Sequence, residues 1–279
     1  MGMIPEFKLS NGVEVPAVGL GTFLTKDGEE AARCVCEAVE LGYRSIDTAM
    51  IYMNEEGIGK GIRECGVPRK DLYITTKLWN DSHGYDETLR AFDASLKRLG
   101  LDYLDQYLMH WPGLEEESYL PTWKAFEKLY DEGLIRTIGV CNFTKPVLKN
   151  LLAHCNVAPM VNQIEIHPMF QPNDLIRFCQ DKDIQVEAWR PIVWGKLDKE
   201  PILSAAEKYG KTTVQVCLRW HYQRGIRTVP KTTHKDRMAQ NMDIFDFELT
   251  PEEMEAINGL NTFVRTGESP DEFFETSGF

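Results

Sequence analysis

The residues that could do chemistry in this sequence recur at one kind of place, the end of a short apolar segment. Asp47 follows Ser45-Ile46, Lys77 stands near the end of residues 72–78, and His110 follows residues 104–109. If these segments are parallel strands of a barrel, their carboxyl ends share one rim and the side chains converge there. The other members of this series are Thr22, Cys141, Asn142, Gln163, Trp189, Arg190 and Lys231.

Three of these residues lie around a candidate proton donor, Tyr52, which follows Asp47 by five residues and can fold back over the same rim. A phenol is a weak acid with a reference pKa of about 10, and a neighbouring ammonium lowers that pKa. We therefore expect Lys77 to lower the pKa of Tyr52, Asp47 to hold Lys77 charged and aimed, and His110 to hydrogen-bond a substrate oxygen. The set predicts general acid catalysis on an oxygen that develops negative charge.

Each of these residues has a structural alternative when taken alone. Asp47 could cap a turn, Lys77 could be its ion-pair partner, and His110 could be a buried core histidine. Their common position at strand ends favours the chemical interpretation.

A second cluster follows the apolar segment 226–229. Lys231, His234 and Arg237, with the free amides at the start of the next helix, could bind a phosphate monoester, although a surface charge cluster is the alternative. Trp189 offers a flat surface for a planar ring, or simply fills the core. Asn142 and Gln163 match the donors and acceptors of a carboxamide. Together these features predict a reduced nicotinamide cofactor with a 2′-phosphate, facing a carbonyl group.

The elements that must position these residues alternate along the chain. A strand–turn–strand, 7–9 and 13–15 around Asn11-Gly12, is followed by eight apolar segments, at 18–21, 45–46, 72–78, 104–109, 137–140, 160–166, 184–188 and 226–229. Helical patterns cover 29–41, 56–65, 87–99, 122–131, 145–154, 173–179, 201–209 with 213–223, and 235–240. Eight strand–helix units predict an α/β fold, a (β/α)8 TIM barrel with an N-terminal β-hairpin, with residues 1–279 as a single domain.

An open α/β sheet is the alternative architecture. A dinucleotide-binding open sheet carries G-x-G-x-x-G at its first turn. Here Gly19-Leu20-Gly21 is followed by Thr22, Phe23 and Leu24, so the third glycine is missing.

Composition excludes several classes of protein. The chain has 31 Lys+Arg against 43 Asp+Glu, a formal net charge of −12, which argues against binding nucleic acid. With 43% hydrophobic and 27% charged residues it is a globular chain. No segment is apolar enough for a signal peptide or a membrane span. The seven scattered cysteines match no zinc pattern, and no carboxylate cluster accompanies His110 or His167. We expect a reduced, cytoplasmic protein with no metal.

Several of these segments resemble the aldo-keto reductase superfamily, in particular its small microbial diketogluconate reductase and prostaglandin F synthase-like members. The similar segments are GYRSIDTA at 42–49 with Tyr52, Asn54, Glu55 and Gly59, TTKLW at 75–79, LMHWP at 108–112, IGVCNF at 138–143, VNQIEIHP at 161–168, and Pro230-Lys231 with Arg237 and Asn241. The resemblance implies a monomeric barrel that binds NADPH without a Rossmann fold and reduces an aldehyde or ketone.

The resemblance also implies roles for particular residues. Tyr52 would be the acid, with Asp47, Lys77 and His110 around it, and Phe23, Trp79 and Trp111 would line the substrate pocket. The cofactor would contact Thr22, Asp47, Cys141, Asn142, Gln163, Trp189, Arg190, Lys231, Thr232, Thr233, His234, Arg237, Gln240 and Asn241.

The sequence departs from the family pattern at four of these positions. Cys141, Arg190 and Thr232 stand where the family usually has serine, and Gln240 where it usually has glutamate. Arg190 could contact the cofactor pyrophosphate or favour an anionic carbonyl compound. These departures leave a second hypothesis, a nucleotide-binding regulatory protein with little turnover on the same barrel, against which the intact acid cluster argues.

Overall fold

The computed structural model describes residues 4–113 and 116–271. Eight parallel strands pair in chain order, and isolated bridges from Val18 to Thr228 and from Gly21 to Lys231 join the last strand to the first. The strands are β3 Leu20–Gly21, β4 Ser45–Asp47, β5 Tyr73–Leu78, β6 Leu104–Met109, β7 Ile135–Cys141, β8 Val161–Glu165, β9 Gln185–Trp189 and β10 Arg227–Thr228. The barrel prediction is confirmed, and the open-sheet alternative is wrong.

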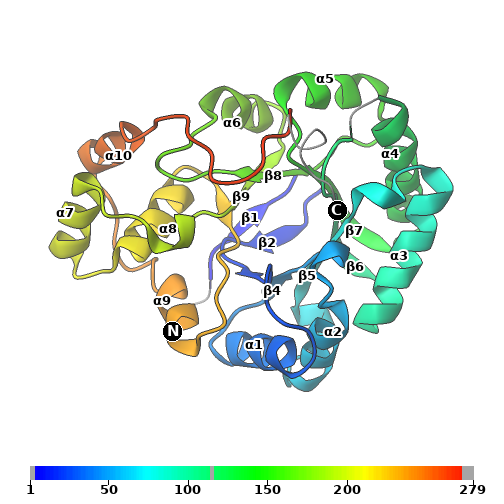
Figure 1. The fold of residues 1–279 in the computed structure, drawn as a ribbon, viewed down its shortest axis with the longest axis horizontal. Helices are drawn as coiled ribbons and strands as arrows, with labels where there is room; N and C mark the ends of the chain where they lie inside the picture. The colour runs from blue at the N-terminus through cyan, green and yellow to red at the C-terminus, as the bar shows by residue number, and fades with distance from the viewer. Residues whose placement is uncertain (1–3, 114–115, 272–279) are drawn as a thin grey trace.

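Helices surround the strands (Figure 1). They are α1 Glu29–Glu40, α2 Glu55–Glu64, α3 Tyr85–Leu99, α4 Glu116–Asp131, α5 Lys145–His154, α6 Asn173–Gln180, α7 Glu200–Tyr209, α8 Thr213–Gln223, α9 Lys235–Met242 and α10 Pro251–Asn258. The expected N-terminal hairpin is also present, as antiparallel strands β1 Glu6–Lys8 and β2 Glu14–Pro16.

Most helices lie within two residues of their predicted bounds, and two differ by more. Helix α4 begins six residues before the expected start at 122, with Pro121 in its second turn, where the missing N–H costs one hydrogen bond and does not stop the helix. Helix α10 was not predicted. Its start is a capping box, in which the Thr250 hydroxyl accepts from Glu253 N and the Glu253 carboxylate accepts from Thr250 N.

Gly19 and Gly21 let the first strand approach the last. A Cβ on Gly21 would lie 2.5 Å from the carbonyl oxygen of Val229, and one on Gly19 would lie 2.9 Å from Arg227 Nη2. The backbone N–H groups of the two glycines donate to Thr228 O at 2.9 Å and Pro230 O at 3.1 Å. The close packing of the first strand against the last therefore explains the two glycines. A phosphate-binding glycine motif is not required to explain them.

Replacing Gly21 by alanine should therefore destabilise the barrel. We expect Gly21→Ala to lower the free energy of unfolding by about 1–3 kcal/mol, the usual effect of overpacking. Gly259→Ala is the matched control, because its φ is −65° and its Cβ would meet no atom closer than 3.4 Å. Urea unfolding of both variants tests this; equal stabilities would show that close approach at Gly21 does not govern closure.

Candidate active site

A cavity of about 1090 Å³ opens at the carboxyl ends of the strands. Most residues of the predicted series line it, together with loop residues that the sequence did not single out. The predicted ones are Thr22, Phe23, Asp47, Tyr52, Trp79, His110, Trp111, Cys141, Asn142, Gln163, Trp189, Arg190 and Lys231. The additional ones include Leu24, Ile51, Pro191, Ile192, Gly267 and Glu268. Leu24, Ile51 and Pro191 adjoin predicted residues in sequence, and Ile192 lies two positions after Arg190, whereas no sequence pattern pointed to Gly267 or Glu268.

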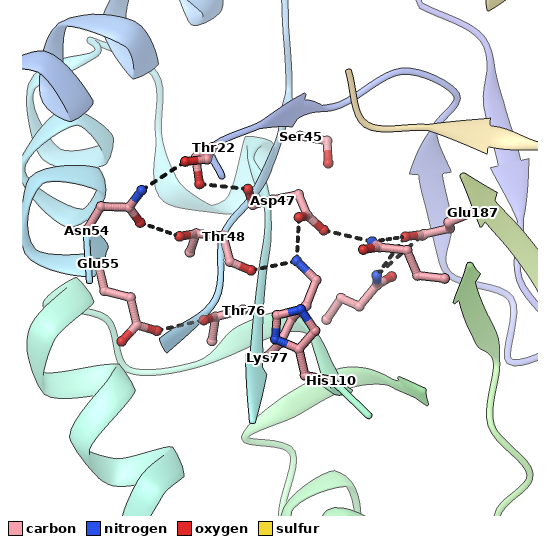
Figure 2. A network of polar contacts seen from close by, with 12 residues as sticks. Thr22, Ser45, Asp47, Thr48, Asn54, Glu55, Thr76, Lys77, His110 and Glu187 are labelled. Carbon is pink, nitrogen blue, oxygen red and sulfur yellow. Dashed lines mark hydrogen bonds and ion pairs between the residues drawn. The ribbon is translucent and has the colours of Figure 1, made fainter. Parts of the chain in front are cut away.

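Lys77 lies directly behind the cavity wall and is fully buried. Its Nζ donates to Asp47 Oδ1 at 2.5 Å and to Thr48 O at 2.8 Å (Figure 2). The same Nζ lies 5.1 Å from the centre of the Tyr52 ring, and the imidazole of His110 packs edge-on against that ring at 5.7 Å. The four residues expected to form the acid cluster therefore lie together.

The side chain of Asn54 holds the loop that carries Tyr52. Its Oδ1 accepts from the Thr48 hydroxyl at 2.7 Å, and its Nδ2 donates to Thr22 O at 3.0 Å (Figure 2). The Nδ2 also donates to Thr25 O at 3.1 Å. Asn54 is itself fully buried. The loop after β3 and the loop after β4 are thereby joined around one amide, which fixes the turn after Asp47.

Glu55, the first residue of α2, ties the same loop to the neighbouring strand and helix. Its carboxylate accepts from Thr76 Oγ1 at 2.6 Å and from Arg98 Nε at 2.7 Å (Figure 2 shows the first contact). The carboxylate is almost fully buried, so the ion pair with Arg98 is required to compensate for its desolvation.

Burial dominates the acid–base properties of the cluster. It raises the pKa of Tyr52 to about 12. The Lys77 ammonium lowers this pKa, as expected, but by less than burial raises it. Burial alone would lower the pKa of Lys77, but the Asp47 carboxylate raises it above its ordinary value. Burial and the charge of Lys77 hold the pKa of His110 well below its usual range. At neutral pH the cluster thus combines a protonated phenol, a charged ammonium and a neutral imidazole.

The amide side chains of Asn142 and Gln163 are partly occupied by protein contacts. Asn142 Oδ1 accepts from Trp189 Nε1 at 2.9 Å, and its Nδ2 donates to His110 O at 3.0 Å. Gln163 Nε2 donates to Asp47 Oδ2 and to Glu187 Oε2, both at 2.9 Å. One N–H of Asn142 and the Oε1 of Gln163 remain for a ligand.

The model for the Aldo/keto reductase family matches residues 17–262. The chain belongs to the aldo-keto reductase family. It is 51% identical over 266 residues to a glyoxal reductase of Bacillus subtilis, covering 95% of this chain and 96% of that protein. It is 43% identical over 269 residues to the methylglyoxal reductase DkgA of Escherichia coli, covering 95% and 97%.

The fold of this aldo-keto reductase also matches solved structures. An aldo-keto reductase of Bombyx mori, crystallised in complex with NADP, superimposes with a TM-score of 0.91 at 38% identity, covering 98% of this chain and 97% of that one. The two chains are therefore similar in both sequence and fold over nearly their whole lengths.

The predicted phosphate cluster of the reductase is only partly assembled around the cavity. Lys231 lines the cavity and is exposed. Within the described part of the chain, the remaining members lie outside the cavity wall, along the segment that leads into α9 and on that helix: Thr232, Thr233, His234, Arg237, Gln240 and Asn241. Thr232 is buried, and its hydroxyl accepts from His234 N at 3.2 Å.

Arg190 lies between the cavity and the C-terminal segment. Its backbone φ is 49°, its guanidinium lies 5.5 Å from the Trp189 ring, and its Nη1 donates to Thr266 O. Burial lowers its pKa, and its charge interacts with Glu165, Glu268 and Tyr52. Arg190 therefore brings positive charge to the wall that also carries the acid cluster.

Glu165, at the end of β8, holds the C-terminal segment against this wall. Its Oε1 accepts from Thr266 N and Thr266 Oγ1, both at 2.7 Å, and from Gly267 N at 3.0 Å. Burial alone would raise the pKa of Glu165, but hydrogen bonds from His167 and Thr266 lower it to about 2. This carboxylate thereby places Gly267 and Glu268 at the cavity.

Other kinds of site have no counterpart in residues 4–113 and 116–271. No helix in these ranges is long and apolar enough to cross a membrane. They also contain no group of three or more His, Cys, Asp and Glu side chains suited to a metal ion. All seven cysteines are free thiols.

The lowered pKa of Glu165 predicts a pH-dependent contribution to stability. An unfolded glutamate titrates near 4.3, so the ionised folded form contributes about 3 kcal/mol above pH 5, and this is lost as the pH falls toward 2. Glu165→Gln should therefore be less stable than wild type at pH 7, and the gap should shrink in acid. Thermal or urea unfolding at pH 7, 5 and 3 measures it, with the exposed Glu248→Gln as control. A gap independent of pH would contradict this account.

Proposed function

We propose that this aldo-keto reductase reduces aldehydes and ketones to alcohols with NADPH, with Tyr52 as the proton donor. The observation that carries the proposal is the joining of Tyr52, Lys77, Asp47 and His110 at one wall of a large cavity. Family membership supports the reaction class, and the NADP complex of the Bombyx mori relative supports the cofactor.

The residues present fit a nicotinamide nucleotide. One N–H of Asn142 can donate to a carboxamide oxygen, and Gln163 Oε1 can accept from its NH2 group. Trp189 provides an aromatic face at the same wall, and Lys231 provides an exposed ammonium for the 2′-phosphate. The nicotinamide ring of NADPH supplies the hydride for the carbonyl carbon.

The proton that the reaction requires comes from a side chain of this protein. Tyr52 donates its phenolic proton to the carbonyl oxygen as negative charge develops there. Lys77 then stabilises the phenolate, because its ammonium is held in place by Asp47 and by Thr48 O. The imidazole of His110 is neutral and carries one N–H, which positions the carbonyl oxygen by hydrogen bonding.

We propose small aldehydes, α-dicarbonyl compounds among them, as the substrate class. The named activities of the glyoxal and methylglyoxal reductases support this. The apolar surfaces of Phe23, Trp79 and Trp111 in the cavity suit the uncharged part of such molecules.

We also propose that the enzyme acts as a monomer in the cytoplasm. One chain contributes every group of the acid cluster, and the free thiols are compatible with a reducing compartment.

The proton donor is tested by Tyr52→Phe. We expect the variant to bind NADPH normally and to lose about 10²–10⁴-fold in kcat, because only the acid is removed. NADPH oxidation with methylglyoxal, an aromatic aldehyde and a keto acid measures the rate, and fluorescence measures binding. Tyr85→Phe, on the exposed start of α3, is the control. Unchanged turnover would refute the assignment, and tight NADPH binding without turnover in the wild type would favour a regulatory nucleotide-binding protein.

The cofactor preference is tested by Lys231→Ala. Loss of one charge-assisted contact to the 2′-phosphate should weaken NADPH binding about 10–100-fold while leaving NADH binding nearly unchanged. Lys235→Ala is the control, because Lys235 pairs with Glu40 and lies outside the cavity wall. Dissociation constants for both cofactors decide the question: equal losses would mean that Lys231 does not recognise the phosphate.

A further inference from the structure

Glu187 is a buried residue of β9 that lies next to Gln163, one of the amide side chains that line the cavity. Its carboxylate is fully buried, accepts from Gln163 Nε2 at 2.9 Å and from Gln106 Nε2 at 3.2 Å, and forms an ion pair with Arg227 at 2.8 Å. Glu187 on β9 is in register with Gln163 on β8 and with Arg227 on β10. Figure 2 shows Glu187 across the network from Asp47.

Gln163 is held in one orientation because it donates to two carboxylates. Its single Nε2 donates to Asp47 Oδ2 on one side and to Glu187 Oε2 on the other. Each carboxylate has its own cation, Lys77 for Asp47 and Arg227 for Glu187. An ionised carboxylate only accepts hydrogen bonds, so turning the amide of Gln163 would set its oxygen against both of them.

The fixed amide determines what the cavity offers to a ligand. Both N–H groups of Gln163 are used, so Gln163, which lines the cavity, can present only an acceptor there. Asn142 has its oxygen occupied by Trp189 and keeps one N–H. One acceptor beside one donor is complementary to a carboxamide, whereas a carboxylate would find only one donor and would face the oxygen of Gln163.

We propose that Glu187 is a positioning residue that locks the Gln163 amide, and that the lock makes the cavity select a nicotinamide over a nicotinate ring. The selection rests on the proposed function, since it concerns the cofactor assigned there. Glu187 acts through Gln163 and does not itself reach the ligand.

The test compares binding of NADP⁺ with nicotinic acid adenine dinucleotide phosphate, in which a carboxylate replaces the carboxamide. We expect wild type to bind the carboxylate analogue at least about tenfold more weakly, the effect of one charge-assisted hydrogen bond. In Glu187→Gln, the amide of residue 187 can donate to a turned Gln163, and only Asp47 opposes the turn. The ratio measured is the dissociation constant of the carboxylate analogue divided by that of NADP⁺, each obtained from quenching of tryptophan fluorescence. In Glu187→Gln this ratio should fall by about tenfold.

A double variant distinguishes the effect of the Gln163 orientation from charge repulsion between Glu187 and the carboxylate of the analogue. It also avoids the buried unpaired charge that could prevent the single variant from folding. Glu187→Gln with Arg227→Met removes the ion pair as a unit, so no unpaired charge is buried and the net charge is unchanged. The ratio should fall in the double variant as it does in the single one. A wild-type ratio in the folded double variant would mean that charge alone acts on the analogue, which overturns the proposal.

Gln106→Met is the matched control in the same layer of the barrel. Gln106 donates to Glu187, as Gln163 does, and its Oε1 accepts from the Tyr73 hydroxyl at 2.8 Å. Its replacement should leave the ratio unchanged; an equal fall would indicate general loosening of the core and overturn the proposal.

The wild-type protein alone also tests the proposal, because equal binding of the two dinucleotides by wild type would overturn it. Failure of wild type to bind NADP⁺ at all would instead refute the proposed function.

Discussion

The buried ion pair between Lys77 and Asp47 is the interaction on which the rest of the site depends. Lys77 is fully buried on β5, and a buried ammonium is tolerable only with a close anion and further acceptors. Asp47 Oδ1 and Thr48 O supply both, from the end of the adjacent strand β4 and the residue after it. The chain after Asp47 must therefore turn over the ammonium, and this turn carries Tyr52 to it.

The same ion pair is linked to the closure of the barrel. From Asp47 the hydrogen bonds continue through Gln163 to Glu187 and then to Arg227, so that the Gln163 amide joins two buried ion pairs, Lys77–Asp47 and Arg227–Glu187. Arg227 donates to Pro16 O at 2.8 Å, and its Nη2 lies where a side chain on Gly19 would be. The residues that close the barrel and those that hold the acid cluster are thus parts of one network.

Much of the fold and of the cavity was predictable, because strand ends and helical periodicity are local patterns. Properties that depend on burial in the folded chain could not be predicted in this way. The position of Tyr52 followed from its separation from Asp47 in the sequence, but its raised pKa reflects burial of the phenol among residues from several elements. The sequence predicted that Gln163 would offer both its N–H groups and its oxygen to a ligand. Its N–H groups are used by carboxylates instead, and one of these, Glu187, lies within the apolar segment 184–188, where the sequence analysis did not single it out. The contact of Glu165 with Thr266 joins residues about a hundred positions apart, which no periodic pattern signals.

The raised pKa of Tyr52 is compatible with its proposed role as an acid once the two stages of the proposed reaction are separated. Before reaction, burial keeps the proton on the phenol, with a pKa of about 12. In the proposed transfer, the phenolate would form beside an ammonium that is held in place by Asp47 and Thr48. The low-dielectric surroundings that disfavour the phenolate also strengthen its attraction to Lys77. The favourable interaction therefore grows as the proton leaves, which stabilises the transition state more than the ground state.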